Sequence, residues 1–170
     1  AITILILAWI ISTVVSEMHT GEYLSTLVAG NIHAGFLPVI LFMLAGVMAF
    51  ATGTSWGTFG IMLPIAAAMA VKVEPSLIIP CMSAVMAGAV FGDHCSPISD
   101  TTILSSTGAH CNHIDHVTSQ FPYALTVAAS AATGYLALGM TGSAPLGFVV
   151  TGIVMVVLVF ILKDKKKATA

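Results

Sequence analysis

The segment from Gly92 to Thr102 carries the side chains of this chain that are best suited to ion chemistry. It directly follows an apolar run, and it holds two carboxylates and several hydroxyls (Asp93, Asp100, Ser96, Ser99, Thr101). A charged side chain at the bilayer centre costs about 2.5–3.5 kcal/mol on insertion scales, and it is found mainly where it faces a protein-lined cavity. Carboxylate and hydroxyl oxygens suit a hard cation that has lost its water. The segment therefore predicts a Na⁺ site, with Asp93 and Asp100 as ligands, in the unwound middle of a broken transmembrane helix.

A simpler interpretation stays open for part of this segment. Ser99 or Asp100 is positioned to cap the half-helix that follows Pro97. The hydroxyls of Ser96 and Ser99 can also serve only to satisfy free backbone groups. Asp93 is expected just beyond the end of the preceding helix and has no capping duty there. It is therefore our preferred carboxylate for both cation and proton, with His94 as a second proton-handling candidate or else a neutral hydrogen-bonding residue.

A second polar interruption lies upstream, at residues 53–58, between two apolar runs. Its hydroxyls are candidate cation ligands, and the alternative is that they only close a turn (Thr54, Ser55, Thr58). Trp56 is an unusual residue for the tip of a turn, and it could gate the site or lie at a membrane interface.

The histidines and cysteines raise the question of a metal site. His110, Cys111, His113, Asp115 and His116 are close together in the sequence. No further pair at zinc spacing follows them, so we interpret the segment 110–116 as a soluble connector and expect no structural metal. The 3 cysteines lack paired spacing, and a disulfide framework is not expected.

The composition predicts an integral membrane protein. The chain is 58% hydrophobic and only 7% charged, whereas soluble domains carry about 25% charged residues. It begins inside the apolar run from Ile2 to Val15, which we interpret as a transmembrane helix, 1–16, truncated from a longer protein. A signal peptide would need a basic segment before that run.

The apolar runs define an all-α polytopic membrane protein. We expect a re-entrant helical hairpin at 35–71 with its tip at 53–58, because the second arm, 59–71, would be roughly 20 Å long against a bilayer core of about 30 Å. A broken transmembrane helix at 77–109, with its break at 92–100, follows. Transmembrane helices are then expected at 117–138 and 146–162.

The few lysines set the expected topology. Most of the 5 basic residues follow the last apolar run, in the tail 163–170, and the positive-inside rule makes this end cytoplasmic. Counting back, the loop 110–116 is cytoplasmic and the connector 17–34 is external. The protein is then a multi-pass protein of the cell (inner) membrane.

Taken together, the two polar segments carry a family resemblance. Gly53-Thr54-Ser55-Trp56-Gly57-Thr58, followed by the segment from Gly92 to Thr102, resembles the NhaC-type sodium/proton antiporter family of the ion-transporter superfamily. The likeness continues through 105–108, 115–117 and 120–123, and it covers roughly residues 35–140. It implies the C-terminal one of two inverted repeats, each with a re-entrant hairpin and a broken helix. It also implies that the N-terminal half is missing from this chain and that the protein could form a homodimer.

The resemblance implies secondary active transport, mostly of Na⁺ or Li⁺ against H⁺. Our main hypothesis is that one carboxylate, Asp93, binds either the cation or the proton, backed by oxygens of the two polar segments. Some relatives couple cations to small organic acids or amino acids, and this is the alternative function. The chain has no arginine to hold a carboxylate substrate, although the missing half could supply one.

Other classes of function are less compatible with the residues. An intramembrane metalloenzyme using His94, Cys95 and the 110–116 segment would lack the His-Glu-x-x-His pattern. A purely structural subunit would not need two polar interruptions at membrane depth. We therefore expect a transporter and not an enzyme, with no cofactor, no nucleic-acid partner, and the lipid bilayer, Na⁺ and H⁺ as its partners.

Overall fold

The structure is a computed structural model that describes residues 10, 13–14, 17–19, 23 and 33–168, with side chains as far as residue 162. The expected helix 1–16 and connector 17–34 therefore lie almost entirely outside the described residues. From residue 33 to residue 168 the chain forms helices and turns and no strand.

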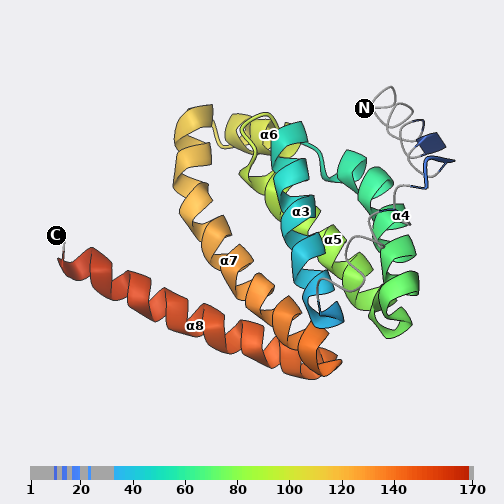
Figure 1. Ribbon diagram of the computed structural model, residues 1–170. Coiled ribbons are helices and arrows are strands. Elements are labelled where there is room, and N and C mark those ends of the chain that lie inside the picture. Colours follow the sequence, from blue (N-terminus) through green and yellow to red (C-terminus); the bar gives the residue numbers. More distant parts are fainter. Residues whose placement is uncertain (1–9, 11–12, 15–16, 20–22, 24–32, 169–170) are drawn as a thin grey trace.

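Between residues 33 and 168 six α-helices and two short 3-10 helices follow one another, and Figure 1 labels the α-helices, α3 to α8. Their bounds are η1 Ala34–Phe36, α3 Leu37–Thr52, α4 Ser55–Val73, η2 Pro75–Leu77, α5 Ile78–Cys95, α6 Asp100–Gly108, α7 His113–Thr141 and α8 Ala144–Ala168. Five segments are long and apolar enough to cross a membrane, namely α3 with η1, α4, α5 with η2, α7 and the part of α8 up to Leu162. The all-α polytopic fold class is confirmed.

Helices α3 and α4 form a hairpin with a very short tip. Gly53 ends α3 in the left-handed conformation, with φ of 68°, which glycine adopts without steric cost. Thr54 then caps α4 by accepting a hydrogen bond from the Gly57 N–H. The expected tip 53–58 is too long, because Ser55 to Thr58 already belong to α4.

Our length argument for a re-entrant second arm is also wrong. Helix α4 has 19 residues, or roughly 28 Å at about 1.5 Å per residue, which is close to the thickness of a bilayer core. The polar residues at its start and Lys72 near its end are helical, although their polarity suggested otherwise. Whether the hairpin crosses the membrane or turns back within it, both of its ends lie on the same side, so the expected order of sides does not change.

The break after α5 is shorter than expected. Helix α5 continues through Gly92 and Asp93 to Cys95, and α6 starts at Asp100, so the break is confined to residues 96–99 and not 92–100. Pro97 has no N–H and disfavours a helical preceding residue, and Ser96 is accordingly extended, with φ of −75° and ψ of 128°. Asp93 is therefore a residue of the last helical turn.

The last two helices are longer than their apolar runs. Helix α7 begins at His113, where Asn112 caps it by accepting from the N–H groups of Ile114 and Asp115. The polar residues of the expected loop 110–116 are thus partly helical, and only a short turn separates α6 from α7. Helix α8 continues to Ala168, so the expected tail 163–170 is largely an extension of that helix.

Close backbone contact joins α3 and α5 at the centre of the bundle. A Cβ added at Gly88 would overlap the carbonyl oxygen of Phe42, and one at Gly92 would overlap that of Gly46. Small residues at such crossings let helices approach closely in lipid. Helix α4 packs against the same pair from one side and α7 from the other (Figure 1). The core of the described residues therefore lies between α3, α4 and α5.

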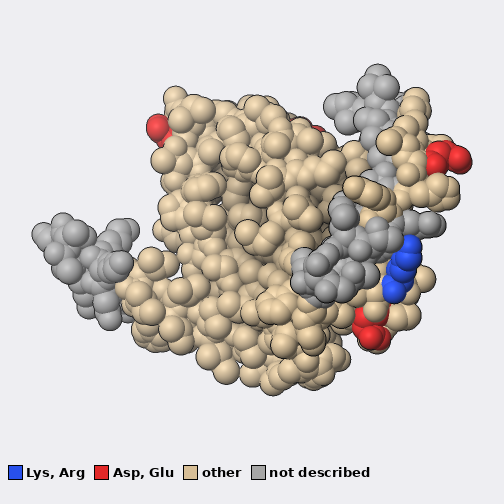
Figure 2. Space-filling view, viewed as in Figure 1, with Lys and Arg blue, Asp and Glu red and all other residues tan. Residues whose placement is uncertain are grey.

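Helix α8 lies at the margin of this bundle. It packs on α7 where a Cβ at Gly134 would overlap the Thr151 hydroxyl, and it then diverges from α3 and α5 (Figure 1). Only 6% of its span is buried. The face seen in Figure 2 is almost free of charge over the helices, with Lys, Asp and Glu only at its edges. Such a surface suits contact with lipid or with further apolar protein.

We expect Gly92→Ala to destabilise the fold, because the added methyl group has no space between α5 and α3. Overpacking of this kind costs about 1–3 kcal/mol, and sometimes more. Gly152→Ala is the matched control, since nothing lies within 4 Å of a Cβ at that position in α8. Thermal unfolding of the purified protein in detergent checks the prediction. Equal melting temperatures for Gly92→Ala and the wild type would contradict the close crossing.

Candidate functional site

Asp93 is a buried carboxylate whose two oxygens each accept a hydrogen bond from a serine. Its side chain is 7% exposed. The Ser55 hydroxyl donates to Oδ2 at 2.8 Å, and the Ser99 hydroxyl donates to Oδ1 at 2.5 Å. Hydrogen bonds to a charged acceptor are the strong ones, typically worth about 1.5–3 kcal/mol each. The site is therefore assembled from the end of α5, the start of α4 and the break.

Packing between the hairpin tip and the break brings these serines together. Gly53 lies so close to Ile98 that a Cβ would come within 2.8 Å of the isoleucine side chain and 3.0 Å of its carbonyl oxygen. Glycine is needed here both for its positive φ and for this approach. The contact aligns Ser55, which follows the tip, with Ser99, which follows Ile98. The two polar segments that the sequence singled out thus meet at one carboxylate.

Ser99 extends the network outward through a second hydroxyl. Its Oγ lies 2.7 Å from Thr101 Oγ1, and either atom can donate. Ser99 is fully buried, whereas Thr101 is exposed. Ser99 is the residue at the N-cap of α6, but its side chain makes no cap hydrogen bond. The Ser99 hydroxyl donates to Asp93 and does not accept from a backbone N–H, as an N-cap side chain usually does.

Two helix ends act on Asp93 in opposite directions. The carboxylate belongs to the last turn of α5, where the negative end of the helix dipole disfavours it. Its partner Ser99 lies at the N-terminus of α6, and the positive end of the α6 dipole favours the carboxylate. The hydroxyl donors are therefore the groups that decide how well the carboxylate is held.

The backbone carbonyls at the break are already engaged by α7. The His94 carbonyl accepts from Gln120 Nε2 at 2.6 Å and from Thr102 Oγ1 at 3.4 Å. The Pro97 carbonyl lies 2.7 Å from His113 Nε2. A cation would have to compete for these oxygens with donors from α6 and α7. The side-chain oxygens around Asp93 are therefore better candidate cation ligands than these carbonyls.

Other hydroxyls of the predicted site have local structural partners. Ser96 is fully buried, and its Oγ accepts from the Ile98 N–H at 3.4 Å. Thr54 caps α4, and the Thr58 hydroxyl donates to the Thr54 carbonyl at 2.9 Å. These residues shape the tip and the break, and none of their hydroxyls has a hydrogen bond to the Asp93 carboxylate.

Asp100 and His94 do not join Asp93. Asp100 is exposed in the first turn of α6, a position that favours an acidic side chain through the helix dipole. The side chain of His94 is also exposed, although its backbone carbonyl takes part in the break. His94 follows Asp93 in α5 and faces another side, because a helix turns by about 100° per residue. Asp100 belongs to a different helix, α6.

The histidine-rich segment does not gather into a metal site in the described chain. No group of three or more His, Cys, Asp or Glu side chains there could hold a metal ion. His113 instead contacts the break, and Cys111 is exposed while Cys81 and Cys95 are buried as free thiols. Every buried side-chain nitrogen or oxygen in the described part has a hydrogen-bond partner.

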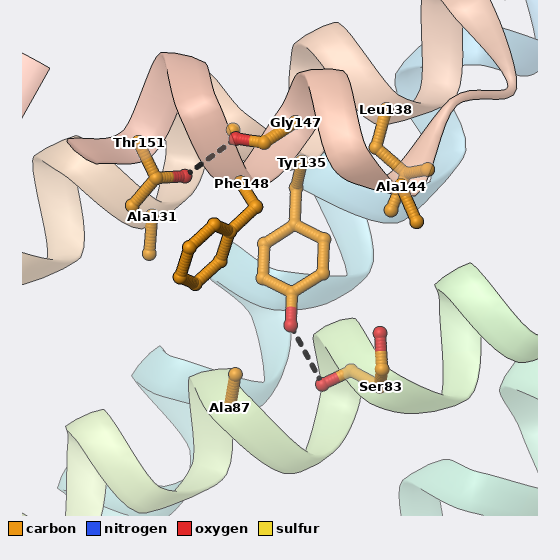
Figure 3. Close-up of a pocket in the computed structure, with 10 residues that line it drawn as sticks. Ser83, Ala87, Ala131, Tyr135, Leu138, Ala144, Gly147, Phe148 and Thr151 are labelled. Carbon is orange, nitrogen blue, oxygen red and sulfur yellow. Dashed lines mark hydrogen bonds between the residues drawn. The ribbon is translucent and has the colours of Figure 1, made fainter. Parts of the chain in front are cut away.

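A separate cavity of about 300 Å³ lies between α5, α7 and α8. Figure 3 shows Tyr135 and Phe148 side by side within it, with the Tyr135 hydroxyl donating to the Ser83 carbonyl at 3.1 Å. The rest of its lining is mostly small and apolar, and Asp93 is not part of it. Its chemistry offers no charged group, so Asp93 remains the candidate site.

Comparison with known proteins decides the family. The sequence profile of the Na⁺/H⁺ antiporter family matches residues 1–140.

The chain belongs to the Na⁺/H⁺ antiporter family.

Relatives of this family member carry different names. A Haemophilus influenzae protein of uncharacterised function is 63% identical over 97% of this chain and 32% of its own length. The malate-2H⁺/Na⁺-lactate antiporter of Bacillus subtilis is 35% identical over 51% of this chain and 18% of its own. An uncharacterised Na⁺/H⁺ antiporter of Haemophilus influenzae is 32% identical over 62% of this chain and 22% of its own length. This antiporter-family chain thus spans about a third or less of these relatives, and no solved structure matches it.

Sequence reasoning missed two residues of the site in this antiporter-family chain. Gln120 and His113 both come from α7 and hold carbonyls of the break. Gln120 offered one signal, since it is a polar residue within a long apolar helix. His113 was considered only as part of a connector or a metal cluster, and nothing in its neighbours indicated a contact with Pro97.

We expect Ser55→Ala to lower the stability of the folded protein, because Oδ2 of a buried carboxylate loses its donor. The cost should be about 1–3 kcal/mol. Ser105→Ala is the matched control, since that exposed hydroxyl bonds only the Thr101 carbonyl of its own helix, and it should stay within about 0.5 kcal/mol of wild type. Unfolding in detergent measures both. Similar losses for the two variants would argue against the Ser55–Asp93 contact.

Proposed function

We propose that this chain forms part of a secondary transporter that exchanges Na⁺ (or Li⁺) for H⁺, with Asp93 as the carboxylate shared between cation and proton. The observation that carries the proposal is the pair of serine hydroxyls, from the hairpin and from the break, that converge on this one buried carboxylate. Membership of the Na⁺/H⁺ antiporter family supports the same reaction.

The hydroxyl partners allow Asp93 to alternate between two ligands. A charged carboxylate only accepts, so Ser55 and Ser99, at 2.8 and 2.5 Å, direct their protons to it. A hydroxyl also carries lone pairs. When Na⁺ arrives, rotation of each hydroxyl turns an oxygen lone pair toward the cation while the carboxylate supplies the negative charge. The Thr101 hydroxyl, within reach of Ser99, completes a set of side-chain oxygens.

Protonation of Asp93 at Oδ1 reverses the direction of the hydrogen bond to Ser99, while Ser55 continues to donate to Oδ2. The new O–H on Oδ1 donates to Ser99 Oγ, and Ser99 then donates to Thr101. The negative charge that held the cation is gone, so Na⁺ is released. Because protonation removes the negative charge that binds the cation, one carboxylate does not hold both at once, and binding of either expels the other. This competition is sufficient for exchange once the site is exposed alternately to the two sides.

The rest of the transporter would supply what this chain does not. Its curated relatives are about three times as long, and we propose that these residues form a C-terminal repeat that works with a preceding N-terminal half. We further propose that the basic residues after the apolar part of α8 keep the C-terminus in the cytoplasm, by the positive-inside rule.

The test is Na⁺-driven proton movement in vesicles that hold the protein at its natural length, without any organic solute. We expect Na⁺ addition to change the internal pH with wild type. Asp93→Asn should abolish the change, because an amide can neither take up the proton nor supply the charge. The expected loss is at least about 100-fold, comparable to losing an ion ligand.

Asp100→Asn is the matched control for this experiment. It makes the same chemical change on an exposed carboxylate that lies outside the Asp93 network, and we expect it to retain exchange. Normal exchange by folded Asp93→Asn would refute the assignment of Asp93. Loss of exchange in Asp100→Asn alone would return the role to the other carboxylate that the sequence suggested.

A second candidate function is exchange or symport of a small organic solute. The names of two relatives favour it, the malate-2H⁺/Na⁺-lactate antiporter of Bacillus subtilis and the arginine/ornithine antiporter of Halobacterium salinarum, which is 34% identical over 67% of this chain. This function predicts no pH change with Na⁺ alone. A pH change or Na⁺ uptake that appears only after an organic acid or amino acid is added would support it over simple cation/proton exchange.

A further inference from the structure

His113 is held between the break and α6 by both nitrogens of its ring. As the first residue of α7, it has Nε2 at 2.7 Å from the Pro97 carbonyl oxygen and Nδ1 at 3.0 Å from the Ser106 hydroxyl. Ser106 is buried and His113 is partly buried. One side chain of α7 thus contacts both the break and the helix that follows it.

The partners fix where the ring carries its proton. A carbonyl oxygen only accepts, so Nε2 must be the protonated nitrogen. Ser106 Oγ lies 2.9 Å from the Ile103 carbonyl as well as 3.0 Å from Nδ1. In the neutral ring Ser106 donates to Nδ1, and in the charged ring Nδ1 donates to Ser106, which turns its proton to Ile103. Both states keep the Nε2–H···O bond to Pro97.

This bond supports a segment that has few bonds of its own. Two N–H groups of residues 96–99 bond to backbone carbonyls, that of Ser96 to the Asp93 carbonyl at 3.1 Å and that of Ser99 to the Ser96 carbonyl at 3.3 Å. Pro97 contributes no N–H. The carbonyl that His113 holds belongs to the peptide linking Pro97 to Ile98. Ile98 contacts the hairpin tip at Gly53, and the next residue, Ser99, donates to Asp93.

We propose that His113 is a positioning residue for the cation site, which sets the break so that Ser99 reaches Asp93 and Ile98 meets the hairpin tip. The role rests on the proposed function, in which Ser99 is a ligand of the cation. His113 touches neither Asp93 nor the transported ion, and it acts through the Pro97 carbonyl. Gln120, on the same helix, holds the His94 carbonyl at the other end of the break.

Substitutions at position 113 can show whether the hydrogen bond to the Pro97 carbonyl matters or only the volume of the side chain. The amide nitrogen of glutamine lies as many bonds from Cα as Nε2 of histidine, so His113→Gln can still donate to the Pro97 carbonyl. The amide nitrogen of asparagine corresponds to Nδ1, so His113→Asn reaches Ser106 only. His110→Asn is the control, since His110 is exposed and has φ of 51°, which asparagine tolerates.

The first readout is the Na⁺ concentration for half-maximal proton movement in vesicles. His113→Ala and His113→Asn should raise it roughly 10–100-fold, as is usual when a support behind an ion ligand is removed, with a smaller effect on the maximal rate. His113→Gln should restore most of the wild-type value, and His110→Asn should match wild type. An unchanged value in His113→Ala, or rescue by asparagine and not by glutamine, overturns the proposal.

A second readout does not depend on transport. Cys95 is 1% exposed in the last turn of α5, directly before the break, and Cys81 is fully buried further back. In a Cys111→Ser background, His113→Ala and His113→Asn should speed maleimide labelling of Cys95, while His113→Gln resembles wild type and Cys81 stays unlabelled. Equal labelling of Cys95 in all variants overturns the proposal that His113 holds the break through the Pro97 carbonyl.

The two readouts keep the hypotheses distinct. If wild type moves no protons in response to Na⁺, the proposed function fails, while the labelling of Cys95 still decides whether His113 holds the break. If His113→Ala also exposes Cys81, that variant has lost its fold. The comparison of glutamine with asparagine, which both keep a polar side chain, then decides the proposal.

Discussion

A buried carboxylate needs hydrogen-bond donors, and this need organises the described part of the chain. Asp93 lies at the end of an apolar helix, and its donors are two serines from other segments. To deliver them, the hairpin must turn at Gly53 and the chain must leave its helix at Ser96. Hydroxyls donate hydrogen bonds to the carboxylate but leave its charge in place. A lysine or arginine would neutralise that charge. The negative charge therefore remains available to a cation, and the tip and the break both serve that one atom group.

Helix α7 comes later in the chain and contacts this arrangement through two side chains. Its side chain Gln120 holds the His94 carbonyl, just before the break, and its side chain His113 holds the Pro97 carbonyl, within the break. Backbone groups that are left unpaired away from water are costly. At 2.6 and 2.7 Å these two bonds are shorter than the backbone bonds of 3.1 and 3.3 Å at the break. The carbonyls of His94 and Pro97 are therefore already occupied by protein donors.

The sequence predicted the class of fold, but not the bounds of the helices. Apolar runs identify membrane helices, and the pattern of a carboxylate beside hydroxyls singled out Asp93, Ser55 and Ser99, which the structure brings together. Their role as a cation site stays a prediction. Polar residues were interpreted as breaks, yet Asp93 and Ser55 are helical, because a polar residue facing protein partners is compatible with a helix in lipid. The contacts of His113 and Gln120 join segments 16 and 26 residues apart, and no local pattern encodes which polar groups such packing brings together.

The glycine contacts between α3 and α5 restrict how this part of the protein can move. Where Gly88 and Gly92 bring two backbones into contact, there is no layer of side chains that could yield by small rotamer changes. Sliding one helix along the other would have to pass in steps of a whole turn, about 5.4 Å. Helices α3 and α5 are therefore expected to move as one rigid body. Gly53, which ends α3, and residues 96–99, which follow α5, lie at the same end of this pair and next to the carboxylate. A rotation at these two joints would therefore change the surroundings of Asp93 first.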